Sequence, residues 1–292
     1  MSKSNTHEVW LVGIAIVAIL VLVSWTRPVR EPMSSRGHRP PVLNPHNIPN
    51  YISQTLGLET RQVSTILSMI GGPEQSNVEW FKQNNGKSVF GYCENIDDDR
   101  GVTMGISGFV SKYTEFDTVF KNYNVNDYRK ETGNPDDCKP FSKCKLCDWV
   151  NARGNDPNWI AAQWMVYHEK YIVPVMKFMP KQPNLNNALI KGLLLDTAMN
   201  AGLGDEGNAW GMDTLVRNTK GSTPFEWVKN FCILRYTHFT KGNTEEGKRG
   251  RLLAWYGLAL FKKWDMRGVN PCYMAYCNNG KHLGGCKGCP SS

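Results

Sequence analysis

Apolar residues recur at intervals of three and four through much of the chain, and this spacing predicts a mostly helical protein. The first clear helix is expected over residues 59–70 and is expected to end at Gly71-Gly72-Pro73; its buried face comprises Val63, Ile66, Leu67 and Ile70. Residues 102–110 combine glycines with β-forming residues, and they predict a short strand or hairpin instead.

Four further helices are expected in the second half of the chain. Asp156-Pro157 supplies an N-cap and a first-turn proline for the first of them, and Pro174 is expected to kink it. Another helix spans residues 185–200, a capping box at Thr223-Pro224-Phe225-Glu226 begins the third, and the last spans residues 245–264. The predicted fold class is therefore α+β, mainly helical, with one small β element.

An uncharged apolar run over residues 9–25 is just long enough, at about 1.5 Å per residue, to cross a bilayer as a helix. No small-x-small cleavage site follows it, so we expect an uncleaved single-pass transmembrane anchor in preference to a signal peptide. The predicted organisation is a tail at 1–8, the anchor at 9–25, a flexible linker at 26–50, a folded domain at 51–268, and a cysteine-rich tail at 269–292.

The nine cysteines favour disulfide bonds and an oxidising compartment. Seven of them form two close-spaced groups, one in an insertion at about residues 130–150 and one in the tail, where disulfides are preferred over a zinc site; the tail group is Cys272, Cys277, Cys286 and Cys289, with His282 among them. Basic residues that follow the run 9–25 favour a cytoplasmic body. We weigh the cysteines more heavily and expect the domain to be extracytoplasmic, or on a virion or cell surface.

The charge is uneven along the chain. The net charge of +8 suggests an anionic partner such as a membrane surface, a nucleic acid or an acidic wall polymer. Residues 74–117, however, hold eight acidic and four basic side chains, so this stretch favours a cationic or neutral substrate. We expect no nucleic-acid partner, no cofactor and no metal.

Two carboxylates, Glu74 and Asp98, lie on either side of a short irregular segment and form the strongest candidate for acid and base chemistry. Glu74 follows an apolar helix, where desolvation favours the protonated form. Asp98 lies among Asp97, Asp99 and Arg100 in a polar loop that favours the ionised form. The alternative interpretation is that Glu74 caps a turn and that the aspartates form a solvated loop or a cation site.

The motifs of this stretch carry a family resemblance. The segments Glu74 to Trp80, Glu94-Asn95-Ile96-Asp97-Asp98-Asp99-Arg100-Gly101-Val102-Thr103, and Gly108 to Asp117 resemble the chitosanases of glycoside hydrolase family 46, in the lysozyme-like superfamily. The resemblance implies a lysozyme-like two-lobed domain with its small β element at the cleft. The sequence departs from the family pattern at Asp97 and Asp99, which replace glycines, and at Ser107, which replaces an apolar residue.

The resemblance also implies roles for individual residues. Glu74 is the implied general acid, Asp98 the general base, and Thr103 the residue that orients the attacking water. Arg100 is implied as a local ion-pair partner and Asp117 as the carboxylate that binds the sugar amine. Asp196 and Arg235 match residues that support the acid through a buried network; Asp196 on an apolar helix independently needs a partner, for which Arg235 is the candidate.

The function predicted on this basis is inverting endo-hydrolysis of a β-1,4-linked glucosamine polymer, chitosan. Two alternatives remain open at this point. The first is a muramidase-like activity on peptidoglycan, which the positive net charge favours. The second is a non-catalytic, membrane-anchored structural or carbohydrate-binding protein on a degenerate hydrolase fold, which the altered residues around Asp98 favour.

Overall fold

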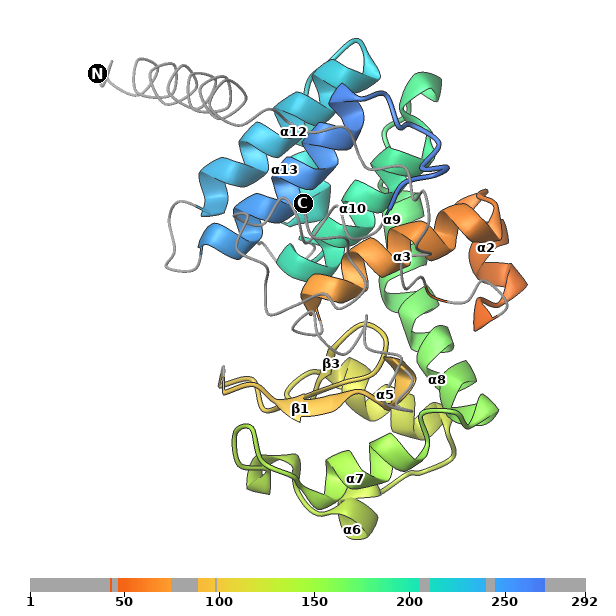
Figure 1. The fold of residues 1–292 in the computed structure, drawn as a ribbon, viewed down its shortest axis with the longest axis vertical. Coiled ribbons are helices and arrows are strands. Elements are labelled where there is room, and N and C mark those ends of the chain that lie inside the picture. The colour runs from red at the N-terminus through yellow and green to blue at the C-terminus, as the bar shows by residue number, and fades with distance from the viewer. Residues whose placement is uncertain are drawn as a thin grey trace.

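The computed structural model describes residues 43, 47–74, 89–97, 99–204, 211–239 and 245–270. Figure 1 shows these residues in two lobes. The helical lobe comprises α2 (Asn50–Leu56), α3 (Thr60–Glu74), α9 (Val173–Lys177), α10 (Ala188–Ala201), α11 (Met212–Asn218), α12 (Pro224–Phe239) and α13 (Glu245–Leu260). The sheet lobe comprises β1 (Cys93–Asn95), β2 (Val102–Met104), β3 (Phe109–Val110), α5 (Thr114–Asn122), α6 (Tyr128–Thr132) and α7 (Lys145–Ala152). The mainly helical α+β class is therefore confirmed.

A long helical segment joins the two lobes (Figure 1). It consists of α8 (Pro157–Tyr167), a π-helical turn η5 (His168–Ile172) and α9. The N-cap prediction is confirmed, because Asp156 Oδ1 accepts a hydrogen bond of 2.8 Å from the backbone N–H of Asn158. α8 packs against α5 of the sheet lobe, and η5 packs against α2 and α10 of the helical lobe. The π turn therefore lies where the chain passes from one lobe to the other.

The sheet is small and antiparallel, with strand order β1-β2-β3. Glu94 pairs with Thr103 and Asn95 with Val102, so residues 96–101 form the connection between the first two strands. Disulfide bonds hold the sheet lobe together, one between Cys93 of β1 and Cys147 of α7 and one between Cys138 and Cys144. The predicted disulfides in the 130–150 insertion are thus confirmed, although Cys147 pairs outside that insertion.

The core runs without interruption through both lobes and is built around large aromatic side chains. Trp159, Trp164, Trp227 and Trp255 are all buried. Each gains about 3–5 kcal/mol of stability over a truncated side chain by the usual cost of such core substitutions. The relative position of the lobes is therefore fixed largely by α8, which carries two of these tryptophans.

The helix predicted for residues 59–70 does not stop at Gly71-Gly72-Pro73 but continues to Glu74. Proline fits helical φ and removes only one i to i−4 hydrogen bond, and Pro73 is the penultimate residue, so little of the helix is lost.

The capping box at the start of α12 differs in one detail. Thr223 Oγ1 accepts from the N–H of Glu226, but Glu226 accepts in return from the N–H of Ser222 at 2.9 Å.

The predicted localisation as a single-pass membrane protein has to be corrected. Among the described residues, no helix is both long enough and apolar enough to cross a bilayer. The two longest, α12 and α13, have 16 residues each, whereas a crossing needs about 20 apolar residues. Segment 9–25, on which the prediction rested, lies outside the described residues, as do the linker residues 26–42 and the cysteines and His282 of the tail.

Candidate active site

The two predicted catalytic carboxyls belong to different lobes. Glu74 is the last residue of α3 in the helical lobe, and its side chain is not among those the structure describes. Asp98 belongs to the connection between β1 and β2 in the sheet lobe, and it lies outside the described residues. Their roles as acid and base, and the distance between their carboxyl groups, therefore stay predictions.

The turn around Asp98 keeps the backbone shape that glycines would give it. Asp97, Asp99 and Gly101 have φ values of 59°, 60° and 85°. The left-handed region costs a residue with a side chain about 1–2 kcal/mol, and aspartate is among the few that visit it because its carboxylate can bond locally. In this turn Asn95 Oδ1 accepts a hydrogen bond of 3.0 Å from the N–H of Asp97. Residues 97 and 99 therefore adopt a backbone conformation that glycine would also adopt.

The second half of the turn is fastened to the segment that follows β3. Ser111 makes both fastening bonds with Val102: its Oγ accepts from the N–H of Val102 at 2.9 Å, and its own N–H donates to the Val102 carbonyl at 2.8 Å. Lys112 Nζ donates to the carbonyl oxygen of Asp99. A Cβ on Gly101 would lie only 2.3 Å from Ser111 Oγ, so only glycine fits there.

Thr103 lies in the middle of β2 with an unused hydroxyl group. The residue is 4% exposed, and its Oγ1 has no hydrogen-bond partner in the described part of the chain. A buried hydroxyl without a partner loses about 1–3 kcal/mol of desolvation energy. Such a group is expected to bind a polar atom other than those of the described residues. Arg100, the other predicted residue of this hairpin, is exposed within the turn.

Asp117 lies on the first turn of α5, where it faces α6. Its Oδ1 is 3.6 Å from Arg129 Nη2, and the Arg129 guanidinium lies 4.7 Å from the centre of the Tyr128 ring. Burial, followed by the Asp117 charge, raises the pKa of the Tyr128 hydroxyl above its ordinary value. Asp117 is thus already engaged by a cation of its own lobe. Glu115, two residues earlier, has no ion-pair partner among the residues described here.

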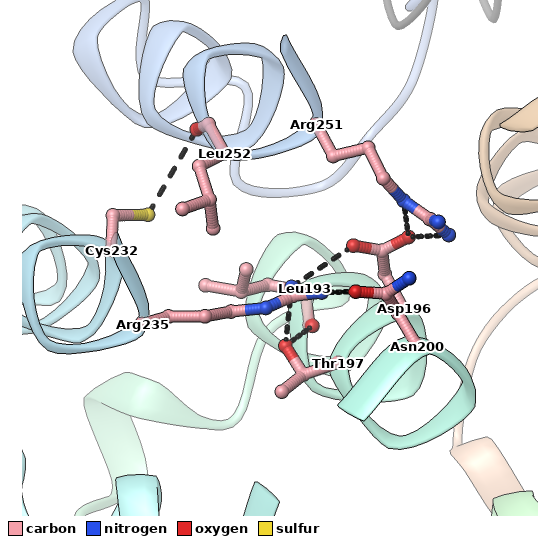
Figure 2. Close-up of polar contacts among 8 residues, drawn as sticks. All are labelled: Leu193, Asp196, Thr197, Asn200, Cys232, Arg235, Arg251 and Leu252. Atoms are coloured by element: carbon pink, nitrogen blue, oxygen red, sulfur yellow. Dashed lines mark hydrogen bonds and ion pairs between the residues drawn. The ribbon is translucent and has the colours of Figure 1, made fainter. Parts of the chain in front are cut away.

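Asp196 and Arg235 form the ion pair expected from the sequence, and Figure 2 shows the cluster around them. Both residues are fully buried, and Asp196 Oδ2 is 3.1 Å from Arg235 Nη1. Arg235 also donates to Thr197 Oγ1 at 2.7 Å and to Asn200 Oδ1 at 3.2 Å. The other carboxylate oxygen of Asp196 accepts from Arg251 Nη2 at 2.7 Å and from Arg251 Nε at 3.0 Å. The cluster therefore joins α10, α12 and α13.

The electrostatics of this cluster favour an ionised carboxylate. Burial acts to raise the pKa of the Asp196 carboxyl, but the charges of Arg251 and Arg235 outweigh it and hold the pKa below its ordinary value. Burial also lowers the pKa of the Arg235 guanidinium, although Asp196 opposes this effect. The carboxylate of Asp196 is therefore ionised, and it lies between the guanidinium groups of Arg235 and Arg251.

Sequence reasoning missed Arg251, and a signal for it was available. The apolar face of α13 includes Trp255 and Leu258, which are both fully buried. Arg251 precedes Trp255 by four residues, so the arginine lies on the same face. A cation on such a face needs a buried anion. Asp196 provides it from a helix whose side chains are buried on nearly all sides.

Known proteins with related sequences are chitosanases. A model of glycosyl hydrolase family 46 matches residues 68–251. A chitosanase of Niallia circulans is 26% identical over 250 residues, which cover 75% of this chain and 78% of that protein. A chitosanase of Bacillus subtilis strain 168 is 26% identical over 176 residues, covering 53% of this chain and 62% of that protein.

Two solved structures with a similar fold are also chitosanases. A family 46 chitosanase of Gynuella sunshinyii, in complex with chitotetraose, matches with a TM-score of 0.54 at 20% identity, over 72% of this chain and 93% of that one. A mutant chitosanase of Bacillus subtilis MY002, complexed with 6 GlcN, matches with the same TM-score and coverage. Since the family model covers well over half of the 292 residues, the protein belongs to glycosyl hydrolase family 46 and is a glycoside hydrolase.

Proposed function

We propose that the protein hydrolyses chitosan. It cleaves internal β-1,4 links between glucosamine units of the polymer, with inversion at the anomeric carbon. Membership of glycosyl hydrolase family 46 carries the proposal, together with the two related chitosanases. The acidic stretch 74–117 also suits a polymer that carries protonated amines.

Glu74 is the proposed general acid and Asp98 the proposed general base. Inversion requires one carboxyl to protonate the leaving oxygen while another activates a water on the opposite face of the sugar, with about 6.5–9.5 Å between them. An origin in two lobes, at the end of α3 and in the β1–β2 turn, is compatible with two carboxyls that act from opposite sides of a bound chain.

Thr103 is the proposed residue that orients the attacking water. Its buried Oγ1, for which the described residues offer no hydrogen-bond partner, supports this role. Thr103 follows Asp98 by five residues and lies on the strand that leaves the turn. A threonine hydroxyl can accept from the water while the base removes a proton. Arg100 is the proposed ion-pair partner within the turn, where it would help to keep Asp98 ionised.

The carboxylate that binds the sugar amine is proposed to lie on the first turn of α5. The sequence resemblance implies Asp117, but an amine would have to share that carboxylate with Arg129. Glu115 lies about 200° around the same helix at 100° per residue and is the alternative. Assays of Asp117→Asn and Glu115→Gln on chitosans of different acetylation separate the two. Only the variant that removes the amine-binding carboxylate is expected to lose its preference for deacetylated polymer.

The Asp196 cluster is proposed to support the acid through the helix that carries it. α10 packs against α3. Asp196 ties α10 to α12 through Arg235 and to α13 through Arg251, so these ion pairs hold in place the helix that supports α3. Loss of these ion pairs would let α3 shift and displace Glu74 from the leaving oxygen. Displacements of about 1 Å can reduce catalysis by about 10²-fold.

Release of reducing sugars from chitosan tests the proposal. Glu74→Gln and Asp98→Asn are expected to lower kcat by about 10²–10⁴-fold, the range for a lost acid or base. The matched controls are Asp97→Asn and Asp99→Asn, which make the same chemical change beside Asp98. Proton NMR of the first product is expected to show the α-anomer; the β-anomer would contradict inversion, and loss of turbidity of cell walls without chitosan hydrolysis would favour a muramidase.

A further inference from the structure

Tyr113 is an aromatic side chain exposed beside the proposed catalytic turn. It is 53% exposed, and its ring makes no aromatic or cation contact among the described residues. Tyrosine tends to bury much of its ring in proteins. An exposed tyrosine ring beside a proposed active site therefore indicates a surface that a ligand can cover.

The backbone of Tyr113 is held firmly in place. Its N–H donates to the carbonyl of Val110 at 2.9 Å, and its own carbonyl accepts from the N–H of Phe116 at 3.2 Å at the start of α5. The two residues before it, Ser111 and Lys112, are those that fasten the turn 99–102. The ring is therefore attached, through one residue, to the turn that contains Asp98.

We propose that Tyr113 binds a sugar ring of the substrate next to the proposed general base, by stacking its face against the C–H face of the pyranose. This inference rests on the proposed function. A protonated glucosamine amine near the ring face would add a cation–π attraction, which suits a polycationic polymer. Because the backbone is already fixed, stacking requires only the side chain to become ordered, which keeps its entropic cost small.

Phe141 supplies a matched control within the same lobe. It is 70% exposed, but its N–H donates to the carbonyl of Asn95 at the β1 edge, opposite the β3 edge from which Tyr113 follows. If exposed aromatic surface in general attracted the polymer, Phe141 and Tyr113 would contribute alike. Tyr113 follows the β3 edge and Phe141 contacts the β1 edge, so we expect only Tyr113 to contribute.

The experiment compares wild type, Tyr113→Ala, Tyr113→Phe and Phe141→Ala in hydrolysis of glucosamine hexamer and in its binding by calorimetry. Tyr113→Ala is expected to raise KM and weaken binding by about 2- to 10-fold, the usual range for an aromatic contact, with a smaller change in kcat. Tyr113→Phe keeps the ring and is expected to restore both values, and Phe141→Ala is expected to match wild type. Unchanged melting temperatures show that the variants fold.

The outcomes separate this inference from the proposed function. If wild type cleaves the hexamer and Tyr113→Ala has the same KM as Phe141→Ala, the stacking role is overturned and the proposed function stands. Hexamer binding without turnover, weakened only by Tyr113→Ala, overturns the proposed reaction and supports the stacking role. If wild type neither binds nor cleaves the hexamer, both are overturned.

Discussion

Replacing Asp196 by asparagine tests the buried cluster most sharply, because it removes the anion that two buried arginines share. Asp196 is 0% exposed, and the side chains of Arg235 and Arg251 are 0% and 6% exposed. Asp196→Asn removes the negative charge that Arg235 Nη1 and Arg251 Nη2 both contact. Removing one partner of a buried ion pair typically costs about 3–5 kcal/mol, and we expect a loss of that size.

The number of ion pairs that each change breaks also predicts a ranking of variants. Arg251→Met breaks one of the two ion pairs and leaves Asp196 in contact with Arg235, so it should cost less than Asp196→Asn, which breaks both. Asp127→Asn is the matched surface control, because Asp127 pairs with Lys130 at 2.9 Å where both side chains are exposed. Its cost should stay below about 1 kcal/mol.

Thermal unfolding followed by circular dichroism measures these differences. For a domain of this size, 1 kcal/mol shifts Tm by about 2–4 °C, so Asp196→Asn should lower Tm by about 6–20 °C. Equal and small losses for Asp196→Asn and Asp127→Asn would refute the view that the cluster is an essential link between the three helices. A larger loss for Arg251→Met than for Asp196→Asn would refute this ranking.

Three further predictions concern acid, disulfides and the turn. The pKa of the Asp196 carboxyl is held below its ordinary value of 3.8, so its stabilising contribution is complete above that pH and is lost as pH falls towards the folded-state pKa; urea unfolding should show a steeper acid loss for wild type than for Asp196→Asn. The Cys93–Cys147 bridge spans 54 residues and the Cys138–Cys144 bridge spans 6, so replacing the first pair by alanines should cost about 4 kcal/mol and the second about 2 kcal/mol in the chain-entropy account. Equal costs in denaturant titrations would contradict that account. Asp99→Gly should keep or raise Tm because Asp99 has a φ of 60°, whereas the β-branched Asp99→Val should lower it, and tolerance of valine would show that the turn is not held in this conformation.

Much of the fold could be predicted from local signals. The start of α8 at Asp156-Pro157 and the end of α10 at Gly202 follow from capping and from a glycine at a φ of 78°. The pair Asp196–Arg235 was predictable because a carboxylate on an apolar helix requires a cation. The two helix ends follow from short stretches of sequence, and the ion pair follows from the cost of an unpaired buried charge.

The features that sequence reasoning missed depend on contacts between distant segments. Arg251 reaches Asp196 across 55 positions of the chain, and Cys147 pairs with Cys93 across 54. The involvement of Asp117 with Arg129 depends on how α5 meets α6, which no spacing rule gives. The π turn at His168–Ile172 likewise arises where one helix has to pack against both lobes.

Hydrolysis of chitosan by wild type and Glu74→Gln is the measurement that tests the central proposal most directly. The account predicts release of reducing sugars by wild type, a loss of about 10²-fold or more in Glu74→Gln, and retained activity in Glu59→Gln, which makes the same change just before the other end of α3. Wild-type protein that is folded but leaves chitosan intact, or Glu74→Gln that cleaves it as fast as wild type, would contradict the account.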